Sequence, residues 1–395
     1  MRSVRGTIRV MAGTICAILG ILTAAPSARS DPGTVLSWYA ARGPQAKNNW
    51  LYGDDACVHG WEDCNRCAPT VEQQWADMGA GALSWRARSW HFGWDRSVAP
   101  SGLTPTTAWN PASIPGIIPL PNLFAEWSYH AQGFVRTNDA AVKYAMSHSD
   151  DRHGSLTFIS SSYNIYAMHE TFTAHPSGVF TLGKYVGMVD GTDVVHFFDV
   201  RRALESHAIS YTMSAAVAGG PGVKDGNGGI AMAKLFHGGY LVIVGQGGIS
   251  NPSQETYFYF TDGPLTAPNR LQWLGTAAYT GPAGAGQSEN ISMITECGTG
   301  QLYTVHIAGD DALDGKGWYR LSKVIWGETG PGLQTVAVKG VNQYDEYCHH
   351  RSAASASVRD NGYLDLYCHE RAEDNGFLSG QGDDWEFREG LNYYN

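Results

Sequence analysis

Two Cys-His pairs stand near the carboxyl end of the chain, in the stretch YCHHRSAASASVRDNGYLDLYCHERAED. The pairs are Cys348-His349 and Cys368-His369, and His350 directly follows the first of them. Imidazole and thiolate groups are metal ligands, but neither pair has the spacing of a zinc finger. The chemistry open to these residues is metal binding, acid–base catalysis or disulfide formation.

The segment between the two pairs predicts a β-hairpin. The Asn-Gly dipeptide at 361–362 lies between strand-like runs, and this dipeptide favours a two-residue turn. Such a turn pairs Asp360 with Tyr363, and Cys348 then lies about seven residues too far along the sheet to reach Cys368. We therefore do not expect these two cysteines to bond to each other. The first strand has only small residues, SAASAS, which indicates that another segment packs closely against it.

Four other stretches share this layout of a polar start, a strand, a turn and a second strand with aromatic or β-branched residues. They begin at His130, His175, Gly226 and Ser288, and the stretch from His349 makes a fifth. Antiparallel units repeated every ~40 to 60 residues are typical of a β-propeller. The small residues fit this prediction, because first strands crowd around a propeller's axis. An irregular β-sandwich is the alternative fold.

The five units resemble the blades of five-bladed β-propellers, a group that includes secreted glycosidases, polysaccharide lyases and lectins. They are also similar to secreted bacterial β-propeller proteins with no assigned activity, over residues 127–390. The resemblance implies an all-β propeller fold. The three inner-strand carboxylates of the propeller glycosidases are not found at the corresponding positions of this sequence. The expected first strands begin instead with His130, His175, Gly228 or Gly229, Glu289, and His349 or His350.

Composition and the amino-terminal segment predict an exported protein. Hydrophobic residues make up 43% of the 395 residues and charged residues 16%, so a sizeable core can be buried. Residues 1–28 have a basic start, an apolar stretch and small residues, as in a secretory signal peptide. We expect a secreted protein, extracellular or periplasmic, that is a monomer. The net charge of −10 argues against a nucleic-acid partner, and no later stretch is apolar for the ~18 residues of a membrane span.

Six cysteines remain after the predicted signal peptide, which suggests three disulfides in an oxidising compartment. They are Cys57, Cys64, Cys67, Cys297, Cys348 and Cys368. Their connectivity stays open at this point. The Cys- and Trp-rich residues 31–124, which end in a Pro-rich connector, are expected to form a cap or strap. Residues 125–395 are expected to form the propeller.

Candidate site residues gather at one end of the expected hairpins, because the start of a first strand and the end of a second strand share that end. The predicted catalytic residues are His130, His175, Glu289 and His350. The predicted ligand-binding residues are Arg351, His369, Glu370 and Arg371.

Three hypotheses remain for these residues. His130, His175 and His350 could hold a divalent metal. A histidine and Glu289 could do acid–base chemistry on a sugar without metal, with Arg351 or Arg371 binding a uronate carboxyl. The polar groups could also only satisfy one another, or line a shallow ligand pocket.

These hypotheses predict a protein that engages an extracellular glycan at its central mouth, as a hydrolase or a lyase. The alternative is a non-catalytic propeller that binds a glycan or a protein partner, and a purely structural adhesion module is a third candidate. Because function follows fold poorly, the residues at the mouth must decide between them.

Overall fold

The computed structural model describes the backbone of twenty segments of the chain. They are residues 51–54, 65–77, 90–92, 130–139, 142–149, 154–160, 165–172, 178–189, 194–200, 211–218, 229–236, 238–245, 253–261, 271–280, 290–310, 316–327, 330–341, 354–359, 362–372 and 384–389. These residues are almost all in β-strands, with one short helix, α3 (Val71–Asp77). The predicted all-β class is confirmed. No helix in these segments is long and apolar enough to cross a membrane.

The strands pair with their sequence neighbours in antiparallel runs. The first run is β3 (His130–Arg136), β4 (Val142–Ser149), β5 (Gly154–Ser160) and β6 (Ile165–Phe172). The second run is β7 (Val179–Leu182), β8 (Tyr185–Val189), β9 (Val194–Asp199) and β10 (Tyr211–Ala218). The third run is β11 (Ile230–Lys234), β12 (Tyr240–Gly245), β13 (Ser253–Thr261) and β14 (Leu271–Thr280).

Two further runs incorporate strands from the amino-terminal part of the chain. One run is β15 (Asn290–Glu296), β16 (Leu302–Asp310), β17 (Lys316–Gly327) and β18 (Gly330–Val341), with β1 (Cys67–Ala68) added in parallel beside β15. The other is β19 (Ala354–Val358), β20 (Leu364–Ala372) and β21 (Asp384–Glu389), and β2 (Trp90–Phe92) pairs with β21. The second and third runs are joined by a short parallel pairing of β10 with β14. None of the described sheets closes on itself.

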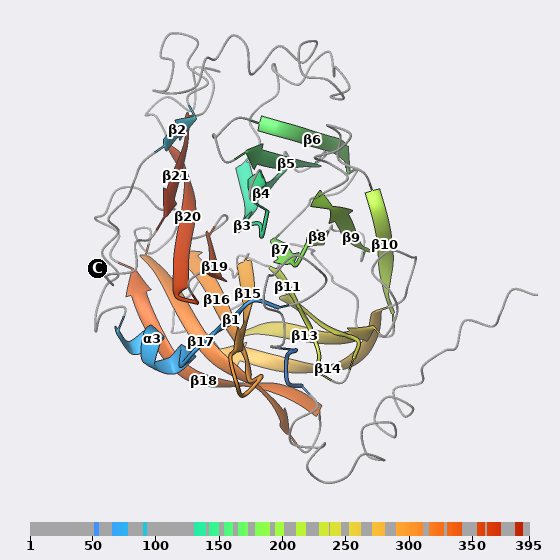
Figure 1. Cartoon of the computed structure of the whole chain (residues 1–395), viewed down its shortest axis with the longest axis vertical. Coiled ribbons are helices and arrows are strands. Elements are labelled where there is room, and N and C mark those ends of the chain that lie inside the picture. Colours follow the sequence, from blue (N-terminus) through green and yellow to red (C-terminus); the bar gives the residue numbers. More distant parts are fainter. Residues whose placement is uncertain are drawn as a thin grey trace, which may run out of the picture.

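The first strands of the runs, β3, β7, β11, β15 and β19, lie together in the middle of the molecule (Figure 1). The later strands β6, β10, β14 and β18 lie around the outside. Each first strand contacts the next one in this order, and β19 in turn contacts β3.

Small residues let these first strands approach one another. A Cβ atom on Gly133 of β3 would lie 2.6 Å from the Val179 backbone nitrogen of β7, and one on Gly229 would lie 2.2 Å from the Ile291 nitrogen of β15. Between β15 and β19, the Ser292 hydroxyl accepts a hydrogen bond of 2.9 Å from the Ala356 amide. The expectation that SAASAS packs closely against another segment is confirmed at β19, which contains most of this stretch.

The hairpin predicted around Asn361-Gly362 forms, but its register is shifted by one residue. Arg359 pairs with Tyr363, because its amide donates 2.8 Å to the Tyr363 carbonyl. The predicted pairing of Asp360 with Tyr363 is therefore wrong. Gly362 has a φ of +82° and its amide donates to the Arg359 carbonyl. These are the features of a three-residue connection with glycine in the left-handed region.

Apolar clusters fill the space between neighbouring runs. Val305, Ile307 and Tyr319 of β16 and β17 pack with Leu364 and Leu366 of β20. On the opposite face of the same run, Ile291, Leu302 and Val324 pack with side chains of β11, β12 and β13. The runs are therefore held face to face by buried apolar side chains, the strongest favourable contribution available to such sheets.

We predict that Gly229→Ala destabilises the protein by about 2 to 4 kcal/mol, because the new methyl group collides with the β15 backbone. Denaturant unfolding of the purified protein measures this change. Gly332→Ala is the matched control, since its Cβ would lie 3.7 Å from the nearest Ile325 carbon, an ordinary contact. Equal losses in the two variants would contradict the close approach of β11 and β15.

Candidate functional site

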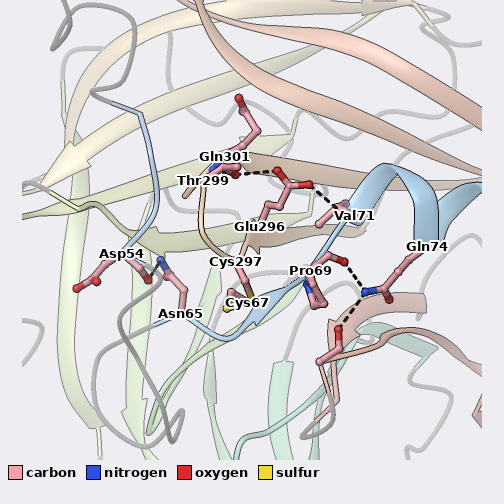
Figure 2. The surroundings of a disulfide bond; sticks show 11 residues. Asp54, Asn65, Cys67, Pro69, Val71, Gln74, Glu296, Cys297, Thr299 and Gln301 are labelled. Carbon is pink, nitrogen blue, oxygen red and sulfur yellow. Dashed lines mark hydrogen bonds between the residues drawn. A yellow bond between two sulfur atoms is a disulfide. The ribbon is translucent and has the colours of Figure 1, made fainter.

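The amino-terminal residues 51–54 and 65–77, here called the strap, cross the end of the molecule at which the first strands finish. β1 of the strap pairs with the end of β15, so that Cys67 stands opposite Thr295. A disulfide joins Cys67 to Cys297, which directly follows β15 (Figure 2). The prediction that the chain forms disulfides is confirmed for this pair. The other four cysteines lie outside the described residues or have side chains that are not described.

Asn65 fastens the strap to β11 with its side-chain amide, which is only 6% exposed. Its Nδ2 donates to the carbonyls of Asp54, at 3.0 Å, and Lys234, at 2.7 Å. Its Oδ1 accepts a bond of 2.8 Å from the Lys234 amide. One side chain therefore satisfies backbone groups at the end of β11 and on the first part of the strap, residues 51–54.

The helix α3 fastens the strap to the β19–β20 hairpin. Gln74 receives a hydrogen bond from the Leu364 amide at 2.8 Å and donates to the Gly362 carbonyl at 3.2 Å. Glu296 accepts from the Val71 amide, which caps the first turn of the helix. Figure 2 shows Glu296 hydrogen-bonded to the Val71 amide and Gln74 hydrogen-bonded to the Pro69 carbonyl, near the disulfide. The strap is therefore bound to three of the five first-strand ends.

A cavity of about 50 Å³ lies between the first strands at the strap end. Its described lining comes from all five first strands, the β3–β4 turn and the strap. The lining residues are Asn65, Arg66, Val135, Asn138, Val179, Phe180, Thr181, Leu182, Met232, Ala233, Ile291, Ser292, Met293, Thr295, Ala356, Ser357 and Val358. This volume holds a few water molecules or one small ion, and it is too small for a sugar ring.

An ion-pair cluster links the first run to the last one beside this cavity. Asp365 of β20 is 1% exposed, and its Oδ2 lies 2.7 Å from Arg359 Nε and 3.8 Å from Arg136 Nη1 of β3. The Arg66 guanidinium of the strap donates to the Val358 carbonyl at 3.4 Å. A buried carboxylate that lost its arginine partners would be strongly destabilising, so this cluster fixes β20 against β3.

Among the residues predicted to form the site, His130 and the backbone of His369, Glu370 and Arg371 lie at the opposite end, where β3 and β19 begin. His130 is the first residue of β3, and Ala131 pairs with His148. His369, Glu370 and Arg371 lie in β20, where the structure describes their backbone only. His175, Glu289, His350 and Arg351 lie outside the described residues. The described residues include no group of three or more His, Cys, Asp or Glu side chains able to hold a metal ion.

The structure buries His306 of β16 between two runs. It pairs with Ile291 and is 1% exposed. Its Nε2 lies 3.3 Å from the Thr256 hydroxyl of β13. Burial, with a smaller contribution from the charge of Arg320, lowers the pKa of His306 to about 3. This histidine is therefore neutral at physiological pH and belongs to the interface between runs.

Sequence reasoning did not find Asn65, Arg66 or the Asp365 cluster. Asp365 has a sequence signal, since it is a charged residue among the strand-like residues of YLDLY. Asn65 and Arg66 have none, because their partners lie 169 and 292 residues away in the chain.

Comparison with known proteins gives weak similarities only. No family model and no curated protein matches the chain. Among solved structures, Myxococcus xanthus glutaminyl cyclase is 11% identical, with a TM-score of 0.35 over 66% of this chain and 90% of that chain. A Bombyx mori GH32 beta-fructofuranosidase is 14% identical, with a TM-score of 0.36 over 67% of this chain and 63% of that chain. The Dos1 propeller is 9% identical, with a TM-score of 0.33 over 61% and 53%. Similarity at this level does not identify an activity for this chain.

We predict that the buried His306 makes the protein less stable in acid. Its pKa is about 3 when folded against an ordinary 6.5, so the unfolded chain binds the extra proton between these values. Stability is then present above pH 6.5 and is lost as the pH falls towards 3, by about 2 to 3 kcal/mol at pH 4.5. Denaturant unfolding at pH 7 and 4.5 measures the loss, and His306→Gln should show a smaller one. The same pH dependence in both proteins would contradict this assignment.

Proposed function

We propose that the chain is a secreted five-bladed β-propeller that engages an extracellular glycan at the mouth where its first strands begin. The observation that carries the proposal is the arrangement of the first strands. They contact one another in sequence order, and the last contacts the first. Side-by-side first strands with antiparallel partners running outward are the arrangement expected of propeller blades.

The pairing of β2 with β21 supports five blades. Without β2, the last run has three strands in the described part, and β2 supplies a fourth from the amino-terminal side of the chain. Such a strand joins an early segment to the last blade, and with the Asp365 cluster it would resist opening of the ring.

The strap supports the choice of mouth. It crosses the end at which β11, β15 and β19 finish, and it is fastened there by the Cys67–Cys297 disulfide and the Asn65 hydrogen bonds. A ligand larger than an ion would then enter from the other end. His130 begins β3, Glu289 directly precedes β15, and His350 precedes β19 by four residues.

In this proposal the histidines and acids at the mouth carry the chemistry. His130, His175 and His350 hold a divalent metal, which would polarise an oxygen of the glycan. Glu289 acts as acid or base. Arg351 and Arg371 bind an acidic sugar through its carboxylate, and His369 and Glu370 contact the same ligand. The reaction is hydrolysis or elimination.

A non-catalytic lectin-like or partner-binding propeller is the second candidate. It is favoured by the absence from the sequence of the three inner-strand carboxylates that propeller glycosidases use. A lectin binds at several peripheral pockets, so no single substitution at the mouth would remove all its binding.

We predict that Glu289→Gln removes turnover of a glycan but keeps its binding, whereas His350→Ala removes both and releases the metal. Screening the mature protein against acidic and neutral polysaccharides, together with elemental analysis, measures these effects. His237→Ala is the matched control, because this histidine follows Phe236 in the sequence and is not one of the residues proposed for the mouth. Circular dichroism shows whether each variant is folded. Glycan binding that survives His350→Ala unchanged would contradict the central site and favour the lectin.

A further inference from the structure

The cavity at the strap end has a lining that suits an anion. Its described lining contains one charged side chain, Arg66, and no carboxylate. The Arg66 guanidinium lies beside the cavity wall, since Nη1 donates to the carbonyl of the lining residue Val358. A guanidinium has five N–H donors and no acceptor, so the charge and the hydrogen bonding of this wall both favour a negatively charged guest.

Most other polar groups of the lining already bind the backbone. The Asn65 amide uses its donors and its acceptor on Asp54 and Lys234. The Thr181 hydroxyl donates to the Tyr185 carbonyl, and Asn138 donates to Gly183. The Ser357 hydroxyl differs from these groups. It is buried, and it has no hydrogen-bond partner among the described residues.

An unpartnered hydroxyl is costly in a protein interior, because the group has lost its water and gained nothing. Ser357 stands next to Val358, which binds Arg66, so a donor and a positive charge lie on the same stretch of β19. Ser357 is also directly opposite Asp365 in the β19–β20 pairing. Asp365 lies against both Arg136 and Arg359, so two guanidinium groups compensate the charge of this carboxylate beside the wall.

We propose that this cavity is a binding site for one small oxyanion, held by the Arg66 guanidinium and the Ser357 hydroxyl. The volume of about 50 Å³ matches a sulfate ion or a carboxylate group and excludes a whole sugar ring. The ligand is therefore a free ion or the charged group of a larger molecule. The site lies at the opposite end of the first strands from the proposed glycan mouth and does not depend on it.

Isothermal titration of the full mature protein with sulfate, acetate and glucuronate tests the proposal. Sodium chloride keeps the ionic strength constant, since sulfate also stabilises proteins without a site. We expect saturable binding of one anion per chain. Arg66→Gln should weaken it about a hundredfold, and Ser357→Ala about tenfold. Lys323→Gln, which removes a similar charge paired with Glu72 away from this cavity, should leave the affinity unchanged.

Ser357→Ala also separates a binding role from a structural one. Because the hydroxyl has no described partner, we expect the variant to unfold at the same denaturant concentration as the wild type, or at a higher one, without anion. Binding of glucuronate as tight as that of acetate would assign the site to the charged group of a sugar, and binding of sulfate and acetate alone would assign it to a free ion. No saturable binding, or equal affinity in the wild type and both cavity variants, would overturn the proposal.

Discussion

The backbones of neighbouring first strands come so close together that only small side chains fit between them. At Gly229 the gap leaves no room for a methyl group, since a Cβ atom would lie 2.2 Å from the β15 backbone. Between β15 and β19, the small Ser292 side chain is accommodated, and its hydroxyl accepts a hydrogen bond from the Ala356 amide. This crowding sets the position of every outer strand, because each later strand pairs with the one inside it. The apolar faces of the runs then pack against one another at a spacing that the first strands determine.

Crowding at the centre leaves little space along the axis, and the strap occupies one end of it. The disulfide between Cys67 and Cys297 ties together segments 230 residues apart in the chain. In the chain-entropy model such a link restricts the unfolded chain strongly. Asn65 donates a hydrogen bond to the Lys234 carbonyl at the end of β11, and Gln74 of α3 accepts one from the Leu364 amide at the start of β20. Chemistry on a large substrate is therefore best sought at the other end, and only a small ion suits the space under the strap.

The sequence predicts where the strands of this protein lie along the chain better than it predicts which distant segments contact one another. Alternating and β-branched residues predict the hairpins, and the small residues of SAASAS predict a crowded first strand, because both signals are local. The register of the last hairpin was predicted one residue out, since an Asn-Gly dipeptide fits both two- and three-residue connections. The Arg136–Asp365 pair and the strap contacts join segments that are far apart in the sequence, and local residue spacing does not predict such contacts. The predicted site residues His175, Glu289, His350 and Arg351 lie outside the described residues, so their arrangement remains a prediction.

The central claim is that the five first strands form one closed ring and not an open arc of repeated units. In an open array each unit depends mainly on its two neighbours, and the end units unfold first. Hydrogen exchange of the first-strand amides in increasing denaturant, followed by mass spectrometry, distinguishes the two directly. The ring predicts that β3, β7, β11, β15 and β19 lose protection together at one denaturant concentration. Loss of protection in β3 and β19 well before β11 and β15 would contradict it.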